Sequence, residues 1–201
     1  MQGVSVSTRL RGLRPILARW CAINTQLGRE WASVNDAPWC YNERASVSVL
    51  AGAIWRSGES AFEEYSEMKR RQGRFAAGRY DLWFSTGKIN YIAEAKYCQV
   101  PFTKSANQMD SVQEVMERAK ADARRCPPDK PTRRLAIVFG CPYVRVGTPA
   151  FLRERIEWLK TASRLVEHDA LAWVFPPASR HLQYDGWLCP GAIVWIKEVC
   201  R

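Results

Sequence analysis

The sequence predicts one α/β domain in which a mixed central β-sheet is flanked by α-helices. The chain has 201 residues, 47% of them hydrophobic, which is enough for one substantial core. Segments with the apolar spacing of amphipathic helices alternate with shorter apolar runs typical of strands. The predicted order is helices, a hairpin, helix, strand, helix, strand and strand, and this order favours a mixed sheet.

Five segments have helical patterns. In the segment 41–56, Val47, Leu50 and Ile54 recur at spacings of three and four, and a third helix follows it as far as Gly73, with Phe62, Tyr65 and Met68 directed inward. The others are 8–28, 109–123 and 149–166. We expect a domain core at about 41–140, with a basic peripheral helix before it and a helix and strands added after it.

Residues 79–97 predict a β-hairpin. Two runs rich in aromatic and aliphatic residues, 79–84 and 91–97, flank a polar segment that contains Gly87. A two-residue turn with Gly first is the type II′ arrangement, and it fixes the pairing of the strands. Further strands are expected at 134–140, 171–175 and 192–199.

The hairpin register brings two carboxylates together. Counting outward from Gly87 pairs Leu82 with Ala93 and Asp81 with Glu94, and opposed residues project to the same face. The strand period of two adds Lys96 to that face. Opposed carboxylates repel each other, so the arrangement needs a cation.

The glutamate at position 43 lies one turn before Val47, on the apolar side of its own helix. A carboxylate in that position is costly unless a cation meets it. Mg²⁺ (or Mn²⁺) is a hard ion that one or two carboxylates hold while phosphates complete its shell. We therefore predict a metal site formed by Asp81, Glu94 and Glu43. Lys96 lies beside it to orient or help deprotonate a water, or to stabilise developing charge.

These residues resemble the signature of the PD-(D/E)XK nuclease superfamily. Asp81 is followed after twelve residues by Glu94-Ala95-Lys96, and Glu43 matches the glutamate often found on the preceding helix. The resemblance implies a restriction-endonuclease-like core, cleavage of DNA or RNA, and dependence on Mg²⁺ or Mn²⁺. Tyr80 replaces the nominal proline, and the Gln-x-x-x-Tyr pattern of RecB-like exonucleases is absent.

The net positive charge of the chain favours binding to a polyanionic partner. Thirty Lys and Arg against twenty Asp and Glu give a net charge of +10, which favours nucleic acid or an anionic membrane. The resemblance implies nucleic acid as the partner, with DNA foremost. Candidate nucleic-acid contacts are Gln99, Lys104, Arg118 and Arg124. A homodimer would be needed to cut both strands symmetrically. No apolar run is long enough to cross a bilayer, so we expect a soluble cytoplasmic protein without membrane contacts.

The seven cysteines are widely spaced and form no C-x-x-C pair, which favours reduced, buried thiols over a structural zinc site. Among the nine tryptophans, those inside predicted elements, such as Trp55, are assigned to the core. Trp31, Trp39 and Trp187 lie in predicted loops, where they would be available to stack on bases.

The same residues could also have no metal-binding role. In that case Asp81 is a strand-edge aspartate paired with Arg79 or Lys96, and Glu94 and Lys96 form an ordinary exposed ion pair. The protein would be a non-catalytic module of nuclease fold that binds nucleic acid or a protein, as an inhibitor or subunit. A third interpretation is an interaction domain whose positive charge recognises an acidic protein.

Overall fold

A mixed sheet runs through the whole molecule. The computed structural model describes residues 1–71, 74–87, 89–101, 108–126, 132–146 and 152–200. Neighbouring strands are antiparallel except β4 and β5, which are parallel. The spatial order is β1 (Gln2–Val6), β6 (Ala170–Val174), β9 (Ala192–Glu198), β5 (Thr132–Arg145), β4 (Ile89–Pro101), β3 (Arg74–Thr86) and β2 (Ala61–Arg71). A short ribbon of β7 (Gln183–Tyr184) and β8 (Trp187–Leu188) extends the end of β5.

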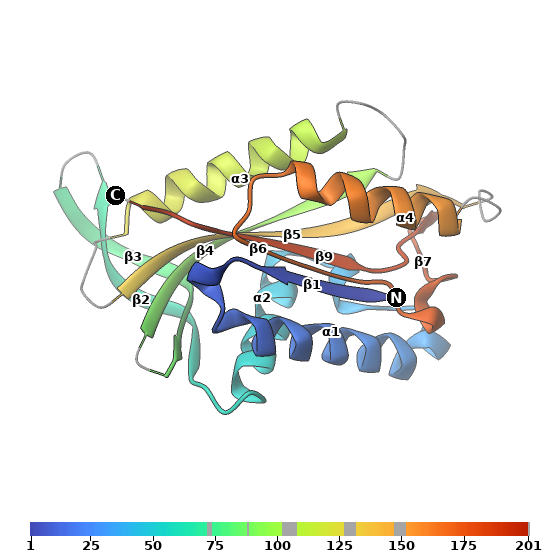
Figure 1. Ribbon diagram of the computed structural model, residues 1–201, viewed down its shortest axis with the longest axis horizontal. Helices are drawn as coiled ribbons and strands as arrows, with labels where there is room; N and C mark the ends of the chain where they lie inside the picture. The colour runs from blue at the N-terminus through green and yellow to red at the C-terminus, as the bar shows by residue number, and fades with distance from the viewer. Residues whose placement is uncertain (72–73, 88, 102–107, 127–131, 147–151, 201) are drawn as a thin grey trace.

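Two helices cover each face of the sheet (Figure 1). α1 (Leu13–Glu30) and α2 (Glu43–Trp55) lie on one face, and α3 (Gln108–Arg124) and α4 (Leu152–Ala162) lie on the other. This arrangement confirms the predicted α/β architecture with a mixed, helix-flanked sheet. Short 3-10 turns connect these elements at Thr8–Leu10, Ala32–Val34, Pro38–Cys40, Ser163–Leu165 and Pro177–Ser179. Within the described ranges, the helices are too short or too polar to span a membrane.

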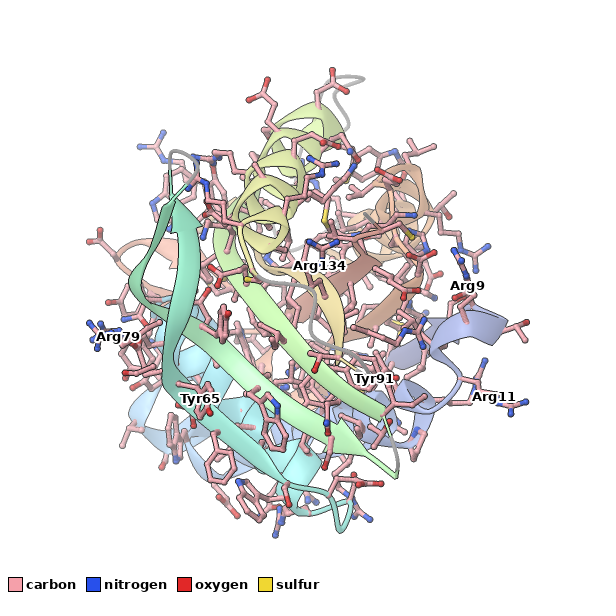
Figure 2. The ribbon with its side chains drawn as sticks, turned by 90° about the vertical axis from the view of Figure 1, so that its left-hand side faces the viewer. Arg9, Arg11, Tyr65, Arg79, Tyr91 and Arg134 are labelled. Atoms are coloured by element: carbon pink, nitrogen blue, oxygen red, sulfur yellow. The ribbon has the colours of Figure 1, made fainter. Side chains whose placement is uncertain are left out.

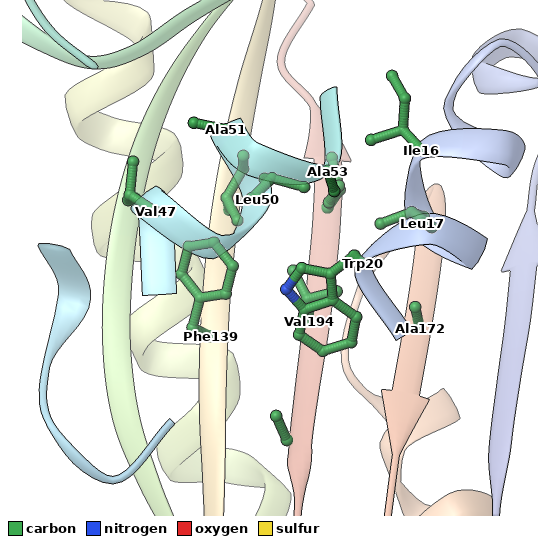
Figure 3. Packing of buried hydrophobic residues seen from close by; sticks show 14 of the residues in the cluster. Ile16, Leu17, Trp20, Val47, Leu50, Ala51, Ala53, Phe139, Ala172 and Val194 are labelled. Carbon is green, nitrogen blue, oxygen red and sulfur yellow. The ribbon is translucent and has the colours of Figure 1, made fainter. Parts of the chain in front are cut away.

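The main core lies between the sheet and the pair α1 and α2. Figure 3 shows Trp20 of α1 and Leu50 of α2 packing towards Phe139 of β5 and Val194 of β9. The apolar side of α1 is buried, so this helix is part of the main core and not a peripheral addition. A second cluster fills the space under α3 and α4, where Trp195 is completely buried. β5 is buried on both faces because it lies in the middle of the sheet.

The hairpin expected at 79–97 is present with the predicted register. Thr86 pairs with Ile89, Phe84 with Tyr91 and Leu82 with Ala93. Gly87 has a φ of 58°, a left-handed conformation that glycine adopts without a steric cost. The predicted helices at 41–56, 109–123 and 149–166 also form, as α2, α3 and α4, and the later strands appear as β5, β6 and β9.

The helix predicted to run as far as Gly73 is wrong, because this segment forms β2, the edge strand of the sheet. β2 pairs with β3 on both sides of Glu64, and the ring of Phe62 packs against Trp83 at a tilt, with ring centroids 5.4 Å apart. Phe62 and Tyr65 are exposed instead of directed inward. The backbone N–H and C=O groups of this segment form hydrogen bonds with β3, in place of the hydrogen bonds that they would form within a helix.

Two of the tryptophan assignments are also wrong. Trp39 is only 3% exposed, and its indole nitrogen donates to the carbonyl oxygen of Cys189 at 3.0 Å. Trp55, the last residue of α2, is 54% exposed and packs edge-on against Phe62. Whether a tryptophan lies in a predicted helix or in a predicted loop therefore does not determine whether its side chain is buried.

Two glycines test the packing of the sheet. A Cβ at Gly140 would lie 2.6 Å from Cζ3 of the buried Trp195, whereas a Cβ at Gly52 in α2 would meet nothing within 4 Å. We expect Gly140→Ala to lower the free energy of unfolding by about 1 to 3 kcal/mol, as overpacking does. Gly52→Ala is the control and should raise it by up to about 1 kcal/mol. Urea denaturation measures both, and an unchanged Gly140→Ala midpoint would contradict this packing.

Candidate functional site

β3 and β4 part at Asp81. The ladder between them ends at Leu82 and Ala93, one pair before the predicted pairing of Asp81 with Glu94. The Asp81 carboxylate instead accepts a hydrogen bond from the backbone N–H of Ala95 at 2.7 Å. Its side chain thus lies at the opening between the strands. β4 continues beyond this point, where Glu94 and Ala95 are buried and Lys96 is partly exposed.

The alternation of side chains also breaks at Asp81. Leu82 packs into the core under α1 and α2, but Tyr80 packs with Ile92 and Cys126 in a separate cluster. Glu64 of β2, which lies across from Asp81, has a φ of 52°, a left-handed conformation that is uncommon outside glycine. Such backbone outliers cluster at functional sites. The distortion turns Asp81 away from the regular face of its strand.

Asp81 lines a pocket between α2, β2 and β3 with a volume of about 270 Å³. Four of the lining side chains are carboxylates and two are arginines. Arg44 and Arg79 both pair with Glu64, at 3.3 and 3.2 Å, and Figure 2 shows Arg79 on the outer side of β3. The lining residues are Glu43, Arg44, Val47, Ser48, Glu63, Glu64, Arg79 and Asp81.

Glu43 is the first residue of α2. Asn42 caps the helix, because its side chain accepts a hydrogen bond from the N–H of Ala45 at 3.1 Å. Burial raises the pKa of Glu43; the nearby Lys96 opposes this shift, whereas Asp81, Asp122 and Glu64 add to it. Ionised Glu43 thus lies in a partly buried site with an excess of negative charge, and such a site favours the approach of a cation.

Lys96 lies at the centre of this group. Its ammonium is 3.0 Å from the Asp122 carboxylate and donates to the carbonyl oxygen of Ala95 at 2.9 Å. Burial lowers its pKa, but the hydrogen bond to Asp122 and the charges of Asp122, Glu43 and Asp81 outweigh burial, so the pKa lies above 10.5. Lys96 is therefore protonated at neutral pH, and it acts as a cation and a hydrogen-bond donor.

Asp122 of α3 is a site residue that the sequence analysis missed. It pairs with Lys96 and also with Arg125, at 2.9 Å. The spacing of residues in the sequence could have identified it, because Asp122 follows the buried Ala119 by three residues and precedes the buried Cys126 by four. An acidic residue at these spacings lies next to the buried side of the helix, as Glu43 does in α2.

Glu94 lies on the α3 side of β4, as Lys96 does. It is only 4% exposed, and the thiol of Cys126 donates to its Oε1 at 3.8 Å. Close by, Arg134 donates to the carbonyl oxygens of Arg124 and Cys126 at 3.4 and 3.3 Å. The structure thus brings Asp81, Glu43 and Lys96 together, and it places Glu94 on the same strand as Lys96 but against the end of α3.

Three of the four candidate nucleic-acid contacts lie in the described parts of β4 and α3. Gln99 of β4 and Arg118 and Arg124 of α3 are exposed, whereas Lys104 lies outside the described residues. Figure 2 also shows Arg9 and Arg11 beside the start of α1, across the picture from Arg79. Exposed arginines with few protein partners are suited to contact phosphates.

A group of three cysteines is the second feature that the sequence analysis missed. Cys40, Cys141 and Cys189 are buried, and their sulfur atoms lie within 4.8 Å of one another. Among the described residues, this is the only group of three or more Cys, His, Asp or Glu ligands with that spacing. The sequence distance between these cysteines concealed the cluster, because only the folded sheet brings them together.

Comparisons of the chain with models of known protein families, with curated proteins and with solved structures found no match.

The raised pKa of Glu43 predicts a pH-dependent stability. The folded state holds its proton more tightly than the unfolded state, whose pKa is about 4.5, so stability is lost as the pH rises through the folded pKa. We expect Glu43→Gln to raise Tm at neutral pH by roughly 1 to 3 °C. This gain should vanish below pH 4.5, where both states are protonated.

The control for this prediction is Glu114→Gln on the exposed side of α3. Scanning calorimetry across the acid range would compare the two variants with the wild type. A Glu43→Gln gain that does not depend on pH would show that the burial and the neighbouring charges of Glu43 are not the cause.

Proposed function

We propose that the chain is a metal-dependent nuclease that hydrolyses phosphodiester bonds in DNA or RNA. One observation carries the proposal: Lys96 and the carboxylates of Glu43, Asp81 and Asp122 gather where β3 and β4 part. An ammonium among several carboxylates, open towards a pocket and flanked by arginines, suits a site for a phosphate and a divalent cation.

The arrangement of elements supports the resemblance to PD-(D/E)XK nucleases. The acidic residue and the Glu-x-Lys triplet stand on adjacent antiparallel strands, β3 and β4, and Glu43 begins the helix that precedes them. The segment from α2 to β5 is a continuous unit of helix, three strands, helix and strand. It begins at residue 43 and ends at residue 145, close to the range 41–140 that the resemblance implies for the core.

The oxygen donors in this site fit Mg²⁺ or Mn²⁺. Asp81 and Glu43 are the carboxylates that would hold the ion, and each lines the pocket. Glu94 belongs to the proposed set as the acidic residue of the triplet, although its carboxylate lies against Cys126. When bound, such an ion polarises the scissile phosphodiester and lowers the pKa of the attacking water.

Lys96 has a defined part in this proposal. Because its pKa is raised, it remains an ammonium at neutral pH and cannot serve as the base that removes a proton from water. It would instead donate hydrogen bonds to a phosphate oxygen as negative charge increases there during attack. Asp122 holds the ammonium in position until the phosphate arrives.

The hairpin of β2 and β3 adds a basic element next to the site. It continues beyond Asp81 to the pairing of Arg71 with Arg74, and β4 does not follow it there. Positions 69, 70, 71 and 74 at its tip are Lys, Arg, Arg and Arg. A basic hairpin that projects from the site on one side, with exposed arginines of α3 on the other, would attract a polyanionic strand.

A second candidate function is supported by the bonds that the site already makes. Lys96 is paired with Asp122, and the Asp81 carboxylate accepts the Ala95 N–H. A module that docks nucleic acid or a protein without cutting would need no more than these structural contacts. This candidate predicts salt-sensitive binding with no metal-dependent cleavage.

Cleavage tests the two functions directly. We would incubate a panel of single- and double-stranded DNA and RNA with the protein in Mg²⁺, Mn²⁺ or EDTA. Metal-dependent cutting is expected in the wild type, and Asp81→Asn and Lys96→Ala should each reduce the rate by about 10²-fold or more, because each removes a group that acts in the transition state.

The matched control is Lys160→Ala, which removes a lysine paired with Glu157 on α4. It should cut at the wild-type rate. If the wild type does not cut but binds, the non-catalytic module is the correct function. If Asp81→Asn and Lys96→Ala cut as fast as Lys160→Ala, the reaction takes place elsewhere in the molecule.

Salt dependence tests the contribution of α3 to nucleic-acid binding. For duplex DNA, each phosphate contact contributes about 0.9 to the slope of log K against log salt concentration. We expect the double variant Arg118→Ala, Arg124→Ala to reduce that slope by about 2 in a fluorescence anisotropy titration. Arg153→Ala with Arg164→Ala, which removes two exposed arginines near α4, should leave the slope unchanged.

A further inference from the structure

The three clustered cysteines come from parts of the chain that are distant in sequence. Cys40 ends the 3-10 turn before α2, Cys141 lies in β5, and Cys189 follows β8. Each is no more than 6% exposed. Their sulfur atoms lie within 4.8 Å of one another, so one ion could contact all three.

We infer that Cys40, Cys141 and Cys189 form a binding site for a thiophilic metal ion, with Zn²⁺ as the expected occupant. Thiolate sulfur is a soft ligand that selects zinc and similar ions over the hard Mg²⁺ expected near Asp81. The two sites therefore differ in their ligand chemistry. This inference does not rest on the proposed nuclease function.

The surroundings of the cluster support a metal site. The Trp39 indole donates to the backbone carbonyl of Cys189 at 3.0 Å, and the hydroxyl of Tyr97 donates to the carbonyl of Trp39 at 3.0 Å. The N–H of Cys189 also donates to the carbonyl of Leu182 at 3.0 Å. These bonds fix the backbone around the ligands, and supporting hydrogen bonds of this kind orient ligands in protein metal sites.

Three protein ligands leave one position of a tetrahedral zinc ion for water or another small ligand. Each cysteine that is still protonated must release its proton to solvent when its sulfur binds, so metal uptake releases protons. The remaining cysteines stand apart from this group: Cys21, for example, is buried in α1, and its thiol contacts the carbonyl oxygen of Trp173.

A metal ion here would connect three segments of the fold. It would tie the turn that leads into α2 to the central strand β5 and to the segment after β8. Because Cys40 lies three residues before Glu43, this link would also hold the first turn of α2 in place. Its expected effect on the fold is to cross-link these three segments.

Metal analysis of the purified protein tests this inference. We would express the chain in zinc-supplemented medium, purify it in reducing buffer, and measure zinc by inductively coupled plasma mass spectrometry. We expect about one zinc per chain in the wild type and in Cys21→Ser, the matched control for a buried cysteine. Cys141→Ser and Cys189→Ser should retain less than about a tenth of that amount, because each lacks one thiolate.

A second measurement avoids the need for folded variants. Replacing zinc by Co²⁺ in the wild-type protein should produce sulfur-to-cobalt charge-transfer absorption, with an intensity expected for three thiolates. Wild-type protein without bound zinc and without this absorption would overturn the inference. So would equal zinc content in Cys141→Ser and the wild type, or a disulfide between two of the three cysteines in the reduced preparation.

Discussion

The parallel pairing of β4 with β5 is the constraint on which the rest of the structure depends. These strands pair in register from Asn90 with Thr132 to Pro101 with Tyr143, in the middle of the sheet. Parallel neighbours need a crossover connection, and here α3 provides it. The crossover places α3 over β4, and this brings Asp122 to Lys96. The site therefore follows from the topology as much as from the triplet on β4.

The second constraint is the end of the ladder between β3 and β4. The Asp81 carboxylate accepts the N–H of Ala95 at 2.7 Å. A buried backbone N–H needs a partner, and a side chain provides one where the neighbouring strand has moved away. The hydrogen bond that replaces the ladder at this point thus holds the Asp81 carboxylate near Lys96.

Much of the fold could be predicted from local patterns. The hairpin register followed from the turn at Gly87, and α2 and α3 followed from apolar spacing, because each depends on residues close in sequence. β2 could not be predicted in this way. Its spacing at Phe62 and Tyr65 resembles that of a helix, and only its pairing with β3 makes it a strand.

The candidate site was predicted in part for the same reason. Glu43 and Lys96 could be placed because each follows the period of its own element. The exact position of Asp81 could not be predicted, since the ladder ends before it and the alternation of side chains on β3 breaks there. Asp122 and the cluster of Cys40, Cys141 and Cys189 depend on contacts between elements far apart in sequence, which single-segment periodicity does not contain.

The effect of Mn²⁺ on the backbone amide signals of the isotope-labelled protein tests the proposed cation site without an activity assay. A paramagnetic ion broadens the signals of nuclei near it, so the spectrum locates the ion independently of activity. The account predicts that substoichiometric Mn²⁺ first broadens the amides of Asp81, Ala95 and Glu43. First broadening elsewhere in the molecule, or no selective broadening, would contradict the assignment of a divalent-cation site to the opening between β3 and β4.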